Sequence, residues 1–376
     1  MKIKLLLCML LGFTLNLCAQ NNFVYTNDDA TPNTVSVFKV NANGSLTLIP
    51  GSPFATGGNG EGDSDIDPGK ITTASVGKHS FLYAGNTADG TVSGFSINPQ
   101  TGSLVLVPGA PVVAGATNSN LSLTASPNGR FLFSTDEVSP VIHVFEIASA
   151  TGELTEVSGS PFPSGANSEG LKVSPNGKFL VVGLKSIDSV GVFAIGEEGA
   201  LTPVAGSPFP ASGAATWVDV NCQSNRVFAS NAGSNLVNAY HMAENGSLTP
   251  VAGSPFSSGG TSTINAFTLS PNNEFLFTSN AFNETISSLL VAPNGSLHPV
   301  PESPFGAADF VGGSATTRDG RFLYVSLFAI AEVDAWSISP TGQLVAVSGA
   351  PFSTGQSPLG EPSLTTFPAP ACPAIE

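Results

Sequence analysis

The chain is poor in charged residues, and above all in positive ones. Only 10% of its 376 residues are charged, with 12 Lys and Arg against 27 Asp and Glu and a formal net charge of −15. So acidic a surface repels nucleic acid phosphates and anionic lipids. We therefore expect neither nucleic acid nor a membrane surface among the partners of this chain.

Several motifs of catalysis and cofactor binding are missing as well. The sequence has no Gly-x-Ser-x-Gly nucleophile elbow, no Cys-x-x-Cys-His haem site and no Gly-x-x-x-x-Gly-Lys phosphate loop. Its four histidines are scattered, which argues against a transition-metal cluster. No segment has the length and period of a helix, which leaves an all-β chain.

The amino terminus has the pattern of a secretory signal peptide. Lys2 and Lys4 precede an apolar run, residues 5–17, and Leu17-Cys18-Ala19 fits a cleavage site. The run is short for a membrane span, which needs about 20 apolar residues. We predict that residues 1–19 are removed on export to the periplasm or the medium, with a lipoprotein acylated at Cys18 as the alternative. The remaining chain, residues 20–376, has 10 basic and 27 acidic residues, a net charge of −17.

One stretch recurs seven times. Its clearest copy is Gly246-Ser247-Leu248-Thr249-Pro250-Val251-Ala252-Gly253-Ser254-Pro255-Phe256, and the opening glycines of the copies are 47 to 58 residues apart. A repeat of about 40–50 residues indicates supersecondary units that must pack on one another to bury their apolar faces. The chain from residue 20 onward is therefore predicted to form one domain.

A full unit runs from residue 120 to residue 162 and reads as four strands. The expected strands are residues 121–126, 130–134, 141–147 and 154–157, separated by turns such as Pro127-Asn128-Gly129. Pro cannot extend a strand ladder, so the Gly-Ser-Pro-Phe end stops the outer strand and offers a Phe ring to the next unit. Four-stranded units repeated radially are the blades of a β-propeller.

The two ends of the chain complete each other. The first unit has only three strands, and the missing inner strand is predicted at residues 362–368, which align with residues 121–127. This strand would close a seven-bladed ring and remove the free sheet edges. We expect such a ring to be monomeric.

Two cysteines remain after the predicted leader, Cys222 and Cys372. Because they fall in repeats far apart in the ring, we expect two separate small apolar residues, with a disulfide as the alternative for an exported chain.

The inner hairpins carry a resemblance to a known family. Their pattern appears as Val173-Ser174-Pro175-Asn176-Gly177-Lys178-Phe179-Leu180-Val181-Val182 and again as Leu269-Ser270-Pro271-Asn272-Asn273-Glu274-Phe275-Leu276-Phe277, with Thr-Gly-x-Leu before outer strands. This resembles the lactonase family of seven-bladed propellers, which includes 6-phosphogluconolactonase-type and carboxymuconate-cyclising enzymes, and is similar to YVTN-repeat surface propellers.

The resemblance implies a lactone-opening site with His, Glu and Arg at one mouth of the central channel, and this sequence departs from it. No histidine begins an inner strand, and Arg130, Arg226, Arg318 and Arg321 all fall at inner hairpin turns. Only Glu169 aligns with the first inner-strand position, so it is the candidate base that would activate water.

Connectors between blades crowd one end of a propeller channel, which is the usual place for a ligand. The candidate ligand-binding residues there are Asn120, Trp217, Asn265, Asp309 and Glu361. A Trp at a concave mouth could stack on a sugar. The alternative is that Trp217 packs against the neighbouring blade.

The first connector carries Asp63, Asp65 and Asp67 on a glycine-rich loop. Alternating carboxylates suit Ca²⁺, although the EF-hand spacing is absent. A solvated acidic insertion without a cofactor is the alternative.

Two functions are compatible with these residues. The first is a non-catalytic propeller that binds a small molecule, a sugar or a protein at the channel mouth. The second is a divergent lactone hydrolase that uses Glu169 as its base. A His or Arg within about 3–4 Å of Glu169 would favour the second hypothesis.

Overall fold

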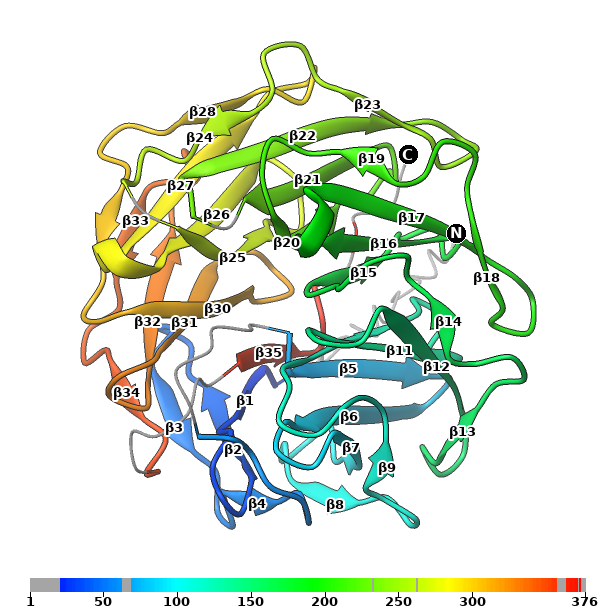
Figure 1. Cartoon of the computed structure of the whole chain (residues 1–376). Coiled ribbons are helices and arrows are strands. Elements are labelled where there is room, and N and C mark those ends of the chain that lie inside the picture. Colours follow the sequence, from blue (N-terminus) through cyan, green and yellow to red (C-terminus); the bar gives the residue numbers. More distant parts are fainter. Residues whose placement is uncertain are drawn as a thin grey trace, which may run out of the picture.

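The computed structural model describes residues 21–62, 69–231, 233–261, 263–356, 363–370 and 372. They form seven antiparallel sheets arranged radially as the blades of a propeller (Figure 1). The predicted leader, residues 1–19, lies outside this part of the chain. Among the described residues there is no helix with the length and hydropathy needed to cross a membrane.

The first three blades follow one plan of four antiparallel strands in order, with a short fifth strand that pairs with the third. Blade 1 contains β35 (Ser363–Phe367), β1 (Phe23–Asn27), β2 (Thr34–Val40), β3 (Leu46–Leu48) and β4 (Phe54–Ala55). Blade 2 contains β5 (Ile71–Val76), β6 (His79–Asn86), β7 (Thr91–Ile97), β8 (Leu104–Leu106) and β9 (Val112–Val113). Blade 3 contains β10 (Leu121–Ala125), β11 (Phe131–Asp136), β12 (Val141–Ile147), β13 (Leu154–Glu156) and β14 (Phe162–Pro163).

The other four blades repeat this plan, and two of them add a 3₁₀ turn. Blade 4 contains β15 (Leu171–Val173), β16 (Phe179–Leu184), η1 (Lys185–Ile187), β17 (Ser189–Ile195), β18 (Leu201–Pro203) and β19 (Phe209–Pro210). Blade 5 contains β20 (Ala215–Val220), β21 (Arg226–Asn231), β22 (Leu236–Met242), β23 (Leu248–Pro250) and β24 (Phe256–Ser257). Blade 6 contains β25 (Ile264–Leu269), β26 (Phe275–Asn280), η2 (Ala281–Asn283), β27 (Thr285–Val291), β28 (Leu297–Pro299) and β29 (Phe305–Gly306). Blade 7 contains β30 (Val311–Thr316), β31 (Phe322–Leu327), β32 (Glu332–Ile338), β33 (Leu344–Ala346) and β34 (Phe352–Ser353).

The predicted closure of the ring is confirmed. β35 pairs antiparallel with β1 from Phe23↔Phe367 to Asn27↔Ser363, so the last strand completes the first blade. The inner strands of neighbouring blades contact each other all round the ring, including β30 with β35 and β35 with β5.

The repeated Gly-Ser-Pro-Phe segment builds more than the predicted strand stop. Its Phe begins a two-residue fifth strand that pairs with the third strand, as β24 does with β22. Between the short fourth and fifth strands, the serine hydroxyl accepts the hydrogen bond of the third strand: Ala239 N donates to Ser254 Oγ at 2.9 Å. The Phe side chain packs against the core between two blades, as predicted.

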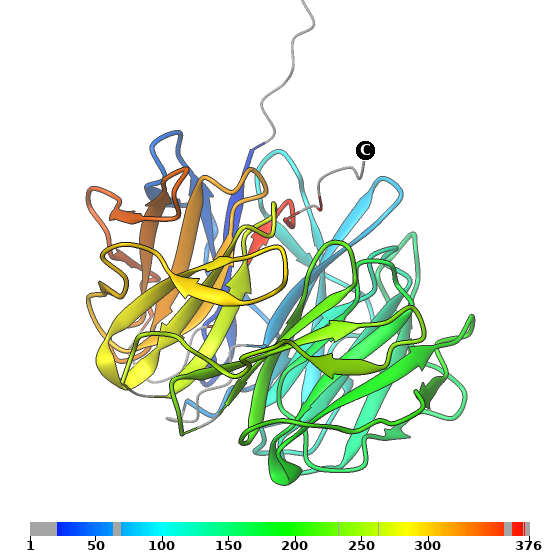
Figure 2. The same cartoon turned by 90° about the horizontal axis from the view of Figure 1, so that it is seen from above.

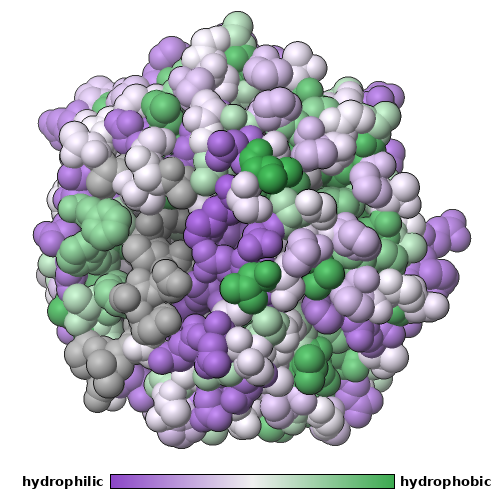
Figure 3. Space-filling view, viewed as in Figure 1, coloured by the Kyte–Doolittle hydropathy of each residue, from purple (hydrophilic) through white to green (hydrophobic). Residues whose placement is uncertain are grey.

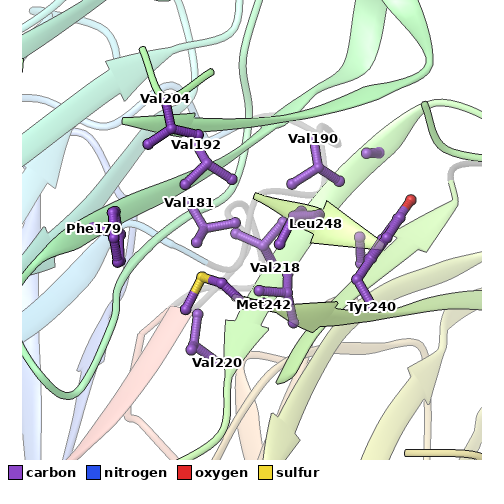
Figure 4. Close-up of a cluster of buried hydrophobic side chains, with 13 residues drawn as sticks. Phe179, Val181, Val190, Val192, Val204, Val218, Val220, Tyr240, Met242 and Leu248 are labelled. Atoms are coloured by element: carbon purple, nitrogen blue, oxygen red, sulfur yellow. The ribbon is translucent and has the colours of Figure 1, made fainter. Parts of the chain in front are cut away.

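Each core lies between two blades. Between blades 4 and 5, Val181 and Val192 from one sheet face Val218 and Met242 from the next (Figure 4). Fully burying a side chain of this kind contributes about 1.5–3 kcal/mol. Because these contacts join neighbouring sheets, no blade can bury its apolar faces without its neighbours.

The meander gives the propeller two different faces. We call the side with the inter-blade connectors and the turns between second and third strands the connector face. The opposite side, with the hairpins between first and second strands, is the hairpin face. The two 3₁₀ turns lie on the connector face, and the chain after β35 leaves from the hairpin face (Figure 2).

The expectation of two separate cysteines is wrong, because Cys222 and Cys372 form a disulfide with Cα atoms 5.2 Å apart. Cys222 lies in the inner hairpin of blade 5, and Cys372 follows β35 by five residues. Both positions are on the hairpin face. The disulfide therefore joins the end of the chain after β35 to the inner hairpin of blade 5.

Candidate binding site

Three of the site residues that the sequence suggests lie at the starts of inner strands on the connector face. Asn120 directly precedes β10, Glu169 comes two residues before β15, and Asp309 comes two residues before β30. Asp309 accepts a hydrogen bond from Phe310 N at 2.7 Å. Asn120 and Glu169 are both buried, and they belong to one cluster.

We call this cluster, Asn120, Glu137, Glu169 and Lys185, the mouth cluster. The Lys185 ammonium lies 3.1 Å from Glu169 Oε2 and also pairs with Glu137 Oε1. Asn120 Nδ2 donates to the second oxygen of Glu137 at 3.4 Å. One cation therefore holds two carboxylates between blades 3 and 4.

The backbone fixes the position of Glu169 in this cluster. Glu169 N donates to Gly183 O at 3.1 Å, and Thr135 Oγ1 donates to the Glu169 carbonyl at the same distance. These bonds attach the connector to the second strands of blades 3 and 4. Because both strands belong to rigid sheets, the carboxylate of Glu169 is held beside the turn that carries Lys185.

The charges of the mouth cluster change the proton affinity of Lys185. Burial lowers the pKa of Lys185, but the carboxylates of Glu169 and Glu137 outweigh burial, so its pKa lies above its usual range. The lysine is therefore a permanent cation. Its side chain is 38% exposed and that of Glu137 24%, so both are within reach of a solute.

Two buried polar atoms close to the cluster have no hydrogen-bond partner among the described residues. They are Asn120 Oδ1 and Ser168 Oγ. Buried polar atoms are usually satisfied by protein or by ordered water. The mouth cluster thus has hydrogen-bonding capacity to spare beside its charges.

Further ion pairs follow the channel. Asp29, in the turn after β1, is 2.8 Å from Lys70, which precedes β5, and both side chains are fully buried. Thr87 Oγ1 donates to Asp29 at 2.7 Å. Lys172 of β15 lies 3.5 Å from Asp219 of β20. Hydrophilic side chains accordingly gather at the centre of the connector face (Figure 3).

Trp217 lies beside the connector that carries Glu169, because a Cβ on the next residue, Gly170, would be 2.8 Å from its ring. Trp217 sits at a bulge of β20, packs into the core between blades 5 and 6, and donates from Nε1 to Phe267 O at 2.8 Å. This packing supports the alternative interpretation of Trp217. Asn265 lies at a bulge of β25, and its side chain is outside the described part of the chain.

Four further acidic candidates of the connectors lie outside the described residues. They are Glu361, Asp63, Asp65 and Asp67, so the calcium site stays a prediction. Within the described ranges, no group of three or more His, Cys, Asp or Glu is arranged to hold a metal ion.

Sequence reasoning missed Glu137 and Lys185. Both directly follow a second strand, and a meander returns that strand to the connector face. The two residues are not part of the inter-blade connectors. The alternating direction of the strands is the signal that could have identified them, because it places every turn after a second strand on the connector face. The histidines and arginines lie elsewhere, as expected: His143 pairs with Glu156 on outer strands, and Arg130 pairs with Glu146 at the hairpin face.

The fold and its polar mouth define a class of protein, the seven-bladed propeller with a candidate ligand site at one end of its channel. The family model "Lactonase, 7-bladed beta-propeller" matches residues 15–167 and 124–265. The chain belongs to this lactonase family. In a comparison with curated proteins, nothing matches.

Solved structures share the fold at low sequence identity. A provisionally assigned 6-phosphogluconolactonase from Bacteroides fragilis is 17% identical with a TM-score of 0.74, over 93% of this chain and 99% of that one. A periplasmic gluconolactonase from Pseudomonas aeruginosa is 18% identical with a TM-score of 0.69, over 92% and 98%. At such identities the likeness concerns the fold.

Proposed function

We propose that this chain is an exported, non-catalytic propeller that binds an uncharged polyhydroxylated molecule, a sugar or sugar lactone, at the mouth cluster. The observation that carries the proposal is the carboxylate–ammonium–carboxylate arrangement of Glu137, Lys185 and Glu169. Hydroxyl groups both donate and accept hydrogen bonds. The cluster offers carboxylate acceptors, ammonium donors and the unused oxygen of Asn120.

The charge of the cluster selects against anions. Two carboxylates and one ammonium sum to −1, and the whole chain is strongly acidic. A phosphorylated sugar would bring further negative charge to this mouth, where like charges repel. An uncharged ligand avoids that repulsion.

The same charge disfavours hydrolysis. Opening a lactone places negative charge on the carbonyl oxygen, which a hydrolase stabilises with donors or a cation. Here the one cation is already shared by two carboxylates. The Glu169 oxygen that would take a proton from water already contacts the Lys185 ammonium at 3.1 Å.

A divergent lactone hydrolase is the second candidate, favoured by the 3.1 Å contact of Glu169 with a cation in a lactonase-family chain. Glu169 would take a proton from water, and the hydroxide would add to the lactone carbonyl beside Lys185. The ring C–O bond would then break, its oxygen would take up the proton, and a hydroxy acid would leave.

Export is part of the proposal. Its support is the leader pattern of residues 1–19 and the periplasmic origin of the Pseudomonas aeruginosa gluconolactonase. Cell fractionation tests it: the chain should be recovered outside the cytoplasm, starting near Gln20. Recovery of the uncut chain in the cytoplasm would contradict it.

A panel of uncharged sugars, uncharged lactones and phosphosugars tests the proposed ligand class. We expect binding of an uncharged member, at least tenfold weaker in Glu137→Gln and unchanged in Glu244→Gln, which removes an exposed carboxylate far from the mouth. No lactone should open faster than it does without protein. Hydrolysis that is lost in Glu169→Gln would instead establish the second candidate, and binding of phosphosugars alone would refute the ligand class.

A further inference from the structure

Four turns on the connector face each expose one large apolar side chain. They follow the second strands of blades 3, 4, 6 and 7, and we call the four residues the apolar crown: Val138, Ile187, Phe282 and Ile330, with 56%, 45%, 61% and 39% of their surface exposed. In Figure 3, hydrophobic side chains form separate patches around the hydrophilic centre of this face. The crown residues therefore share a face with the polar mouth, on four of the seven blades.

Two crown residues, Ile187 and Phe282, belong to 3₁₀ turns without being buried in them. The next bend of these turns is made by Asp188 and Glu284 in the left-handed conformation. Single exposed apolar residues are normal on a protein surface. The four crown residues, however, recur at equivalent turns of one face, which makes them a repeated feature of that face.

Each crown residue has a carboxylate within two residues along the chain. The pairs are Glu137-Val138, Ile187-Asp188, Phe282 with Glu284, and Ile330 with Glu332. The surface thus alternates apolar tips with negative charges. A partner that fits it must bring apolar contacts and positive charge together.

The distribution of basic residues strengthens this point. Of the ten Lys and Arg in the described residues, seven lie toward the hairpin face: Lys39, Lys78, Arg130, Lys178, Arg226, Arg318 and Arg321. Lys70 and Lys185 lie on the connector face and Lys172 lies on inner strand β15, and all three pair with carboxylates. Basic residues are thus concentrated toward the hairpin face, and the connector face carries a net negative charge.

We infer that the connector face docks a polypeptide partner whose basic segment, flanked by apolar side chains, covers the mouth. Phe282 is the anchor, because it is the largest and most exposed crown residue and its ring is supported edge-on by Phe310 at 5.7 Å between centroids. Aromatic anchors and charge complementarity are what such interfaces use. An anionic membrane is disfavoured by the carboxylates around the crown.

The inference does not depend on a small ligand in the mouth. Phe282 and Ile330 belong to blades 6 and 7, whereas the mouth cluster lies between blades 3 and 4, so substitution of these two crown residues leaves small-molecule binding intact. Substitution of Glu137 affects both kinds of binding. The two proposals therefore fail separately.

The test measures binding of two short fluorescent peptides to the purified full chain by polarisation. One peptide carries Lys and Arg flanked by Leu and Phe, and the other has Glu in place of every basic residue. The crown variant is Phe282→Ser with Ile330→Ser. The control is Val105→Ser with Val345→Ser, which removes apolar residues of outer strands that are at least as exposed. Equal melting temperatures show that all variants fold.

We expect the basic peptide to bind the wild type and the outer-strand control equally, at least tenfold more weakly to the crown variant, and more weakly at higher ionic strength. The acidic peptide should not bind. Absence of binding by the basic peptide, or equal binding to the crown variant, overturns the inference. Crown-dependent binding to vesicles of anionic lipid, in place of peptide, would also overturn it.

Discussion

The hydroxyl of Tyr324 donates a hydrogen bond of 2.9 Å to the carbonyl oxygen of Gly44, 280 residues earlier in the chain. This bond joins blade 7 to blade 1. Tyr25 and Tyr83 make the same bond to the carbonyls of Gly102 and Gly152 in the next blades. The first glycine of the repeated stretch is thus an attachment point between blades as well as a turn residue.

The same glycines leave no room for a side chain. A Cβ on Gly102 would lie 2.5 Å from the ring of Phe23 in blade 1, and one on Gly152 would lie 2.4 Å from Phe81 in blade 2. Both glycines also have positive φ angles. An apolar ring therefore takes the place that any other residue's Cβ would need.

Gly102→Ala should therefore destabilise the protein more than a turn substitution alone. Gly177 is the control, because its φ of 73° is close to the 76° of Gly102 but no atom lies within 4 Å of its added Cβ. The left-handed conformation costs an alanine about 1–2 kcal/mol at either site. The clash with Phe23 should add about 1–3 kcal/mol at Gly102. Denaturant unfolding measures both, and equal losses would contradict the packing role.

The disulfide predicts a second loss of stability. Cys222 and Cys372 are 150 residues apart in sequence, so their bond removes much of the freedom of the unfolded chain. Cys372→Ser should lower the free energy of unfolding by about 2–5 kcal/mol. Reduction of the wild type should have the same effect. Two free thiols in the oxidised, unfolded mature chain would show that the bond does not form.

Asp28 predicts a dependence of stability on pH. Burial raises its pKa to about 7, although Thr34, Thr26 and Ser36 donate hydrogen bonds to it. The folded state therefore binds a proton that the unfolded state, with a pKa near 3.8, has already lost. The contribution of Asp28 to the free energy of unfolding is fully present below pH 3.8. It falls as the pH rises toward 7, by roughly 1 kcal/mol per pH unit.

Asp28→Asn isolates this contribution, because the amide has the same shape and does not titrate. Melting temperatures between pH 4 and pH 8 should show a decline in the wild type that is smaller in the variant. Identical pH profiles for the two proteins would mean that Asp28 titrates normally in the folded state.

Lys185→Met should destabilise the connector face. It leaves the carboxylate of Glu169, 8% exposed, without its cation. Removing the partner of a buried charge costs about 3–5 kcal/mol, and we expect about 1–3 kcal/mol here because Lys185 itself is partly exposed. Adding Glu169→Gln should recover most of the loss. Lys178→Met, at an exposed lysine of the hairpin face, is the control; if it costs as much, the cluster is not responsible.

Much of the fold could be predicted from the sequence because each blade repeats one pattern. The expected strands at residues 121–126 and 141–147 correspond to β10 and β12, and the predicted closing strand agrees with β35 within one residue at both ends. The two-residue fifth strands were not predicted, since Phe256-Ser257 and its equivalents are too short to show a period.

Less of the site could be predicted, because it depends on which turns meet across neighbouring blades. The place of Glu169 in the repeat is enough to identify it. Lys185 and Glu137 come from two other turns, and only the packing of blade 3 against blade 4 brings them together. Likewise, the distance in sequence between Cys222 and Cys372 hides the short path of the chain across the hairpin face.

The central claim is that the mouth cluster binds an uncharged sugar or lactone and does not hydrolyse it. Isothermal calorimetry with an uncharged lactone tests both parts at once, because binding gives heat that saturates and turnover gives heat that continues. We predict a saturating isotherm for the wild type and an affinity at least tenfold lower for Glu137→Gln. Continuing heat from the wild type that disappears in Glu169→Gln would contradict the account and identify a hydrolase.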